Sequence, residues 1–245
     1  MRILITNDDG IASPVLPALA KFASRFGKVT VIAPKVEQSG MSHAIDFMHP
    51  IEIKKVDIAP GIDAYSLDST PADCVRFGVL GLKENFDLVI SGINRGYNLG
   101  SDIVYSGTVA AIFEAARLGV KGIALSSDPS YYVDAADTLP ALFDYIEKNE
   151  LLTHGSWYNI NIPKDAAGIK ITRQGGIFFT DRFVNTEGDI FIQEGEQAQT
   201  EAFDTSFDID AVIAGYVSIN PLLATRTDNA VIEKLAKKVN KTCQK

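Results

Sequence analysis

The chain has 245 residues, of which 46% are hydrophobic, and its formal net charge is −8. This length suits one large domain with a substantial core. The excess of acidic side chains disfavours broad binding to nucleic acid, because phosphate backbones require a basic surface. We therefore expect no stable nucleic-acid binding, although a small phosphate compound can still bind at one local site.

The sequence also bears on where the protein resides. No run approaches the ~20 consecutive apolar residues of a membrane span. The short apolar run near the N-terminus is interrupted by Thr6-Asn7-Asp8-Asp9, which is not typical of a signal peptide. Cys74 and Cys243 stand far apart, which disfavours a disulfide framework, and no histidines have the HExxH spacing of a zinc site. We expect an unprocessed cytoplasmic protein with no membrane partner.

The first half of the chain alternates short apolar runs with helical patterns. The apolar runs lie at 3–5, 29–33, 88–90 and 123–125, and the helical patterns lie at 14–25, 72–82, 108–118 and 134–148. Ser13 as N-cap and Pro14 at the first helical position predict where the first helix begins. Ser69 or Thr70 ahead of Pro71 gives the same signal for the second helix. Buried strands that alternate with helices indicate an α/β fold, with a mostly parallel sheet covered on both faces.

The second half is richer in β structure. Residues 158–162 alternate with a period of two, which is typical of a strand. Hairpins are expected within 169–193, around Gly175-Gly176 and around Gly188-Asp189. A strand within 207–220 and a helix over 229–240 then complete the chain.

No repeat, low-complexity tract or flexible linker divides the sequence. We therefore expect a single domain over 1–245. Its core covers about 1–168, a β-hairpin arm covers about 169–205, and a C-terminal strand and helix cover about 206–245. An arm of this kind on an α/β core is often an oligomerisation or lid element.

Two adjacent carboxylates follow the first apolar run, in the sequence ITNDDG. Ligands of open α/β sheets bind beyond the carboxyl ends of the strands, which is where this run ends. Asp8 and Asp9 repel each other, and one would tend to stay protonated unless a cation lies between them. One aspartate alone could cap a helix or form an Asx-turn before Gly10. The adjacent pair favours a bound divalent metal ion.

Neutral oxygen ligands follow the neighbouring strands. Ser39 lies in QSG after the second apolar run, and Asn94 lies in GIN after the third. Together with Asp8 and Asp9 they offer carboxylate, hydroxyl and amide oxygens, which suit Mg²⁺, Mn²⁺ or Ca²⁺. Taken alone, a serine such as Ser39 is more often an ordinary turn residue than a metal ligand. The absence of clustered histidine and cysteine disfavours zinc.

Two segments could bind a phosphate group. The glycines of Gly92–Gly100 are spaced four residues apart, which matches neither GxGxxG nor a P-loop. A long loop rich in glycine and asparagine, including Asn98, can nevertheless bring amides close to a ligand. Ser106, Gly107 and Thr108 open a predicted helix, whose N-terminus attracts anions. A simple N-cap with no ligand explains these last three residues equally well.

Together these parts describe metal-assisted hydrolysis of a phosphate ester. The metal polarises a phosphoryl oxygen and lowers the pKa of a bound water, and the helix start and loop amides stabilise the developing charge. Asp8 or Asp9 could orient or deprotonate the water. A phosphatase of the haloacid-dehalogenase type would instead need a DxD spacing. A nucleotide-sensing or metal-binding regulatory module is a further alternative, which the repulsion between phosphate and two carboxylates disfavours.

Seven stretches of the chain resemble the SurE family of stationary-phase survival nucleotidases. They are ILITNDDG, VIAPKVEQSGMSHAI, YSLDSTPADCV, LVISGINRGYNLGSDIVYSGTVAAIFEA, WYNINIP, ITRQG and GYVSINPL. They follow one another over nearly the whole chain, and the combination of NDDG with SGINxGxNxG and YSGTV is highly specific. The departures are small, since Ser69 stands where glycine is expected and Asn220 where threonine is expected.

The resemblance implies a Rossmann-like core that carries a β-hairpin arm and assembles as a homodimer or homotetramer. It implies one divalent metal ion per subunit, with Asp8, Asp9, Ser39 and Asn94 as its ligands. It also implies a phosphatase that acts on nucleoside 5′- and 3′-monophosphates and on short polyphosphate.

Overall fold

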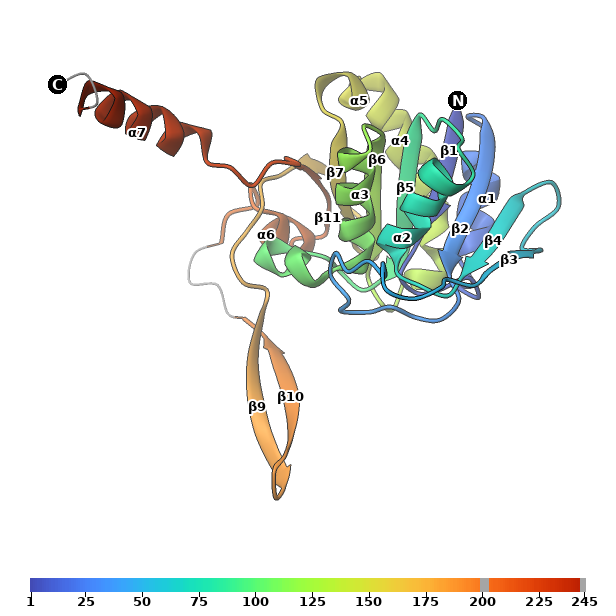
Figure 1. Ribbon diagram of the computed structural model, residues 1–245, viewed down its shortest axis with the longest axis horizontal. Helices are drawn as coiled ribbons and strands as arrows, with labels where there is room; N and C mark the ends of the chain where they lie inside the picture. Colours follow the sequence, from blue (N-terminus) through green and yellow to red (C-terminus); the bar gives the residue numbers. More distant parts are fainter. Residues whose placement is uncertain (199–202, 243–245) are drawn as a thin grey trace.

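The computed structural model describes residues 1–198 and 203–242 (Figure 1). Within these residues, nine strands form one sheet in the order β3-β4-β2-β1-β5-β6-β7-β11-β8. The strands are β1 (Arg2–Thr6), β2 (Lys28–Pro34), β3 (Ile53–Val56), β4 (Asp63–Leu67), β5 (Leu88–Arg95), β6 (Lys121–Ser127), β7 (Trp157–Ile162), β8 (Gly168–Ile171) and β11 (Tyr216–Pro221). From β4 to β7 all neighbours are parallel, whereas β3 and β11 pair antiparallel with β4 and β7. The predicted α/β, mostly parallel fold is confirmed.

Helices cover both faces of this sheet. The helical segments are α1 (Leu16–Ala23), α2 (Pro71–Arg76) with a π-helical turn (Phe77–Gly81), η2 (Gly100–Tyr105), α3 (Gly107–Arg117), η3 (Tyr132–Thr138), α4 (Leu139–Lys148), α5 (Leu151–His154), α6 (Asp208–Ile213) and α7 (Asn229–Thr242). Helices α1 and α4 pack on one face of the sheet, and α2 and α3 pack on the other.

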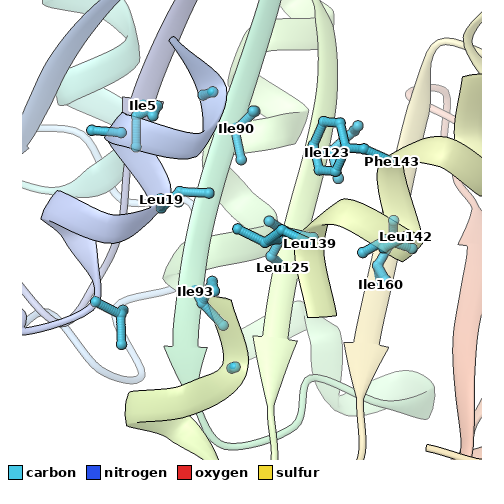
Figure 2. Close-up of a cluster of buried hydrophobic side chains, with 14 of the residues drawn as sticks. Ile5, Leu19, Ile90, Ile93, Ile123, Leu125, Leu139, Leu142, Phe143 and Ile160 are labelled. Atoms are coloured by element: carbon cyan, nitrogen blue, oxygen red, sulfur yellow. The ribbon is translucent and has the colours of Figure 1, made fainter. Parts of the chain in front are cut away.

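The apolar runs of the sequence explain this double cover. Successive side chains of a strand point to opposite faces. Ile5 and Ile90 therefore face α1 and α4, while Leu4 and Val89 face α2 and α3, and all four are fully buried. Figure 2 shows the first of these two cores, with Leu19 of α1 close to the central strands. Because both faces are covered by apolar contacts, polar side chains gather at the ends of the strands.

The first helix begins later than the sequence predicts. Helix α1 begins at Leu16, and its N-cap position is occupied by Val15 without a side-chain hydrogen bond. Ser13 does not cap the helix, because its hydroxyl bonds to the hydroxyl of Tyr132 at 2.7 Å. Pro17, in place of Pro14, supplies the proline of the first turn. The predicted start of α2 is confirmed, since the Thr70 hydroxyl accepts a hydrogen bond from the Asp73 amide at 3.2 Å.

Several elements differ from those that we expected. Strand β3 exposes most of its residues and has no apolar run, and β4 is short and only partly apolar, so neither gave a strand signal. Strand β5 continues to Arg95, through residues that we expected in a loop, with a break in register between Ser91 and Asn94. Helix α6 occupies part of the region 207–220, where only a strand was predicted.

The hairpin arm is shorter than the expected segment 169–205. Strands β9 (Phe179–Glu187) and β10 (Ile190–Gln197) form an antiparallel hairpin that turns at Gly188, as predicted. Gly175-Gly176 makes no second hairpin, because β8 before it pairs with β11 at the edge of the main sheet. Of the expected arm, residues 199–202 lie outside the described residues.

Two extensions project from the body, the β9–β10 hairpin and α7 (Figure 1). Helix α7 follows the prediction for 229–240, while residues 243–245 of the expected C-terminal segment lie outside the described ranges. No helix within 1–198 and 203–242 is both long enough and apolar enough to cross a membrane.

We predict that Ile90→Ala lowers the free energy of unfolding by about 3 kcal/mol, because it leaves a cavity between the central sheet and its helices. Ile213→Ala is the matched control, since Ile213 is half exposed at the end of α6 and the change there should cost about 0.5 kcal/mol. Urea titration followed by circular dichroism measures both. Equal losses in the two variants would contradict this assignment of the core.

Candidate active site

The turn after β1 is built by Asn7. Its Nδ2 donates to the Gly10 carbonyl at 3.0 Å, and its Oδ1 accepts from the Gly10 amide at 3.1 Å. Gly10 has a φ of +92°, and an added Cβ would lie 3.2 Å from the backbone of Val36 and 3.3 Å from the carbonyl of Pro34. Both the backbone conformation and the limited space therefore require glycine at position 10. Asp8 and Asp9 are the two residues enclosed by this turn, which fixes them at the end of β1.

Asp8 is almost completely buried, with 4% of its surface exposed. The Thr108 hydroxyl donates to its Oδ1 at 2.5 Å, and the Thr108 amide donates to its Oδ2 at 3.2 Å. Burial raises the pKa of Asp8 to about 6, against the hydrogen bonds from Thr108 and with a further contribution from the Asp9 charge. A carboxylate desolvated in this way gains from a neighbouring cation.

Asp9 is half-buried and points toward a different neighbour. Its Oδ2 accepts a hydrogen bond from the Tyr132 hydroxyl at 3.0 Å, and Tyr132 in turn bonds to Ser13. Burial raises the pKa of Asp9, the hydrogen bond from Tyr132 lowers it, and the charge of Glu37 adds to the increase. Both members of the pair are therefore costly to ionise in the absence of a cation.

Asn94 and Ser39 reach the same cavity as Asp8. This cavity has a volume of about 280 Å³ and opens at the carboxyl ends of β1 and β5. The Nδ2 of Asn94 donates to the Gly96 carbonyl at 2.9 Å, which orients the amide and leaves its oxygen available to a ligand. Ser39 is exposed, and its hydroxyl donates to Oε1 of Glu37 at 2.6 Å.

Three contacts hold the loop that carries Ser39. The amide of Ser42 donates to the Tyr105 carbonyl at 3.0 Å, and the Ser42 hydroxyl donates to the Val104 carbonyl at 2.6 Å. Nε2 of His43 lies 2.9 Å from Oε2 of Glu114, a buried carboxylate on α3. The loop is therefore fixed to η2 and α3, the two elements that form the next part of the site.

The predicted phosphate-binding residues divide into two groups. Asn98 and Ser106 line the cavity, and the Ser106 hydroxyl also caps α3 by accepting from the Val109 amide at 3.0 Å. Gly107 and Thr108 do not line the cavity, and both lie against Asp8. An added Cβ on Gly107 would come within 3.1 Å of the Asp8 Cβ, so glycine lets the helix start approach the carboxylate closely.

The sequence did not reveal how Asn98 is held. Its amide donates to Oδ1 of Asn161 at 2.8 Å, and its carbonyl accepts from the side-chain amides of Asn159 and Asn161, each at 2.8 Å. Both asparagines are fully buried in β7. The sequence WYNINIP contained a usable signal, because two polar residues alternate with apolar ones in a strand that is buried on both faces.

Several other residues of the site were also missed. Tyr132 lies far from Asp9 in sequence, and nothing in the helical pattern of 134–148 marks it. The cavity is further lined by Arg95, Tyr97, Leu99, Asp102, Tyr105, Phe178, Phe179 and Asp181. Phe178 and Phe179 lie at the root of the arm. Their place in the cavity depends on tertiary contacts between distant segments, which the sequence pattern does not show.

The oxygen atoms present suit a hard divalent cation. Among the described residues there is no group of three or more His, Cys, Asp and Glu side chains that could hold a metal ion. A cation at this cavity would meet the Asp8 carboxylate and neutral oxygens from Ser39 and Asn94, which suit Mg²⁺, Mn²⁺ or Ca²⁺, whereas Asp9 follows Asp8 in the chain but does not line the cavity. The raised pKa values of Asp8 and Asp9 agree with a site that needs positive charge.

The fold and the site together define an α/β protein with an oxygen-lined cavity at the carboxyl edge of its parallel sheet. The family model described as Survival protein SurE matches residues 3–181. The 5′-nucleotidase SurE of Clostridium beijerinckii is 40% identical, over 97% of this chain and 98% of that protein. The 5′-nucleotidase SurE of Thermosipho melanesiensis is 38% identical, over 96% of each chain.

A solved structure gives the same result. The crystal structure of the SurE protein from Aquifex aeolicus is similar with a TM-score of 0.80 and 32% identity, over 97% of this chain and 99% of that one. The chain belongs to the SurE family, as its sequence motifs predict.

We predict that Gly107→Ala weakens Mn²⁺ binding about tenfold, because the new methyl group displaces the buried Asp8 carboxylate. Gly176→Ala is the control, since an added Cβ at Gly176 meets no atom within 4 Å. Titration calorimetry with MnCl₂ gives both affinities. An unchanged affinity in Gly107→Ala, with an unchanged melting temperature, would mean that Asp8 does not hold the metal.

Proposed function

We propose that this chain is a divalent-metal-dependent phosphatase that hydrolyses nucleoside 5′-monophosphates to nucleoside and phosphate. The observation that carries the proposal is the cavity at the edge of the sheet, where oxygens of Asp8, Ser39 and Asn94 meet beside the first turn of α3. The relatives from Clostridium beijerinckii and Thermosipho melanesiensis, both named 5′-nucleotidase, support it. The reaction makes the protein a phosphoric monoester hydrolase.

The proposed metal site holds one divalent ion per subunit through Asp8, Asp9, Ser39 and Asn94. When bound, the ion supplies a Lewis acid for a phosphoryl oxygen and lowers the pKa of a coordinated water. Asp8 is fixed by Thr108 at both oxygens and anchors the site. Asn94 is oriented by its own hydrogen bond to Gly96, so that its oxygen is presented without further rearrangement.

The proposed phosphate site consists of Asn98, Ser106, Gly107 and Thr108. The positive end of the α3 dipole lies at Gly107, and it stabilises negative charge on the phosphoryl group. Asn98 and Ser106 contact the substrate, since both line the cavity. Thr108 acts through Asp8, to which its hydroxyl and amide are both bonded.

Asp9 is the better candidate to orient or deprotonate the attacking water. It is more exposed than Asp8, and its Oδ2 accepts a hydrogen bond from the Tyr132 hydroxyl. Burial raises the pKa of Asp9, which makes its carboxylate a better proton acceptor than an exposed aspartate. Water therefore attacks phosphorus directly, and the adjacent spacing of the aspartates gives no reason to expect a phospho-enzyme.

The proposal includes three further properties. Hydrolysis of nucleoside 3′-monophosphates and of short polyphosphate is implied by the resemblance of the sequence motifs to the SurE family. A cytoplasmic location is expected from the sequence features described above.

We also propose that the protein assembles as a homodimer or homotetramer through its two extensions. The hairpin exposes large apolar side chains on both strands, among them Phe183 and Phe191, and α7 exposes Val231, Ile232 and Leu235. Apolar groups clustered on projecting elements are typical of surfaces that are covered in an oligomer.

We predict that Asp8→Asn and Asp9→Asn each lower kcat/KM by on the order of 100-fold or more, because a ligand charge is lost. Phosphate release from adenosine and guanosine 5′-monophosphate, with Mn²⁺ or with a chelator, measures this. Asp189→Asn at the tip of the hairpin is a control for charge. Wild-type rates in either site variant, or full activity in the presence of the chelator, would refute the proposed metal-dependent hydrolase.

We predict that a shortened arm lowers the oligomeric state. Residues 183–193 are replaced with Asn-Gly, which closes the hairpin between the paired residues Arg182 and Glu194 and keeps the arm's root. Light scattering should show a smaller assembly at the same protein concentration. The arm has no role in assembly if the molar mass is unchanged.

A further inference from the structure

The cavity has a second wall that the hydrolysis of a phosphate group does not require. It is formed by Tyr105 at the end of η2 and by Phe178 and Phe179 at the root of the arm. The rings of Phe178 and Phe179 lie 4.7 Å apart, edge to face. Phe178 is buried, whereas Phe179 is 46% exposed and Tyr105 is 60% exposed. Phe179 and Tyr105 thus present aromatic surface at a cavity whose remaining lining is largely polar.

Asp102 fixes this wall to the body of the protein. Its Oδ2 accepts hydrogen bonds from the amide of Phe178 at 3.0 Å and from the amide of Phe179 at 2.8 Å. A neighbouring contact, from the Ser101 amide to the Gly176 carbonyl at 2.7 Å, reinforces the junction. The root of the arm is therefore held by η2, the segment that leads directly into Ser106 and α3.

We propose that this aromatic wall binds the base of the nucleotide, that Phe179 and Tyr105 are specificity-determining residues, and that Asp102 is a positioning residue. The inference rests on the proposed nucleotidase function and adds which residues distinguish a nucleotide from other phosphate monoesters. Bases of every kind stack on aromatic side chains, so the wall favours a nucleoside without selecting one base.

The charges of the cavity orient the substrate. Asp102 and Asp181 lie in the lining together with the aromatic wall, and their carboxylates repel a phosphate group. Carboxylate oxygens accept hydrogen bonds from ribose hydroxyls or from N–H groups of a base. The phosphate is thereby directed to the metal ligands and the start of α3, and the base to the root of the arm.

The test compares two substrates that share a phosphate ester of ribose and differ in the base. These are adenosine 5′-monophosphate and ribose 5-phosphate, each assayed with Mn²⁺. In Phe179→Ala, the ratio of kcat/KM for the nucleotide to that for the sugar phosphate should fall about tenfold, the effect of losing one base–aromatic stack. Phe47→Ala is the control, because Phe47 is an exposed phenylalanine outside the arm and does not line the cavity. Its ratio should equal that of the wild type.

The role of Asp102 is tested by the same pair of substrates. Asp102→Ala should raise KM for adenosine 5′-monophosphate about fivefold and lower kcat by a smaller factor, since the wall loses its anchor while the metal ligands stay in place. Asp102→Asn retains an oxygen that accepts the two amide hydrogen bonds, so its KM should lie between the wild type and Asp102→Ala. A loss confined to kcat, or equal effects on both substrates, would contradict a positioning role.

The outcomes separate this inference from the proposed function. A wild type that hydrolyses both esters with equal kcat/KM, or a Phe179→Ala ratio within twofold of the wild type, overturns the aromatic wall and leaves the hydrolase intact. A wild type that hydrolyses neither ester in Mn²⁺ overturns both proposals. Light scattering on each variant shows whether the assembly has changed.

Discussion

Two carboxylates held side by side at the end of β1 are the constraint around which the rest of the site is arranged. Asp8 is removed from water and bonded at both oxygens by Thr108, and Asp9 is bonded by Tyr132. Burial raises the pKa of each, so the metal-free site carries an electrostatic cost that a divalent cation relieves. In the proposed site, the neighbouring oxygens of Asn94 and Ser39 would complete the ligands of that cation, beside the helix start at Gly107.

The parallel sheet explains why these residues meet. Strands β1 and β5 are neighbours and parallel, so Asp8, which follows β1, and Asn94, near the end of β5, lie at the same edge of the sheet. The apolar cover on both faces leaves that edge as the place where polar groups can gather. The glycine at position 10 and the side chain of Asn7 then turn the chain sharply enough to keep both aspartates at the end of β1.

The sequence predicted the parts of this arrangement that depend on local pattern. The α/β alternation, the acidic pair, Ser39 and Asn94 could be recognised because each lies at the end of an apolar run or in a specific motif. Strand β3 was missed because its side chains are largely exposed, and β4 because it is short and only partly apolar. The capping role expected for Ser13 was wrong because a tertiary hydrogen bond to Tyr132 uses its hydroxyl. Tyr132, Asp102 and Phe179 could not be found, since their place at the site depends on contacts between distant segments.

The two proposals meet at the root of the arm, because residues that line the cavity are continuous in sequence with the exposed β9–β10 hairpin. All of this depends on a cation at the acidic pair, which anomalous diffraction from crystals grown with manganese observes directly. The account predicts one manganese peak within coordination distance of Asp8 and Asp9, with oxygens of Ser39 or Asn94 completing its shell. A map of active, manganese-loaded protein with no anomalous peak beside this pair would contradict it.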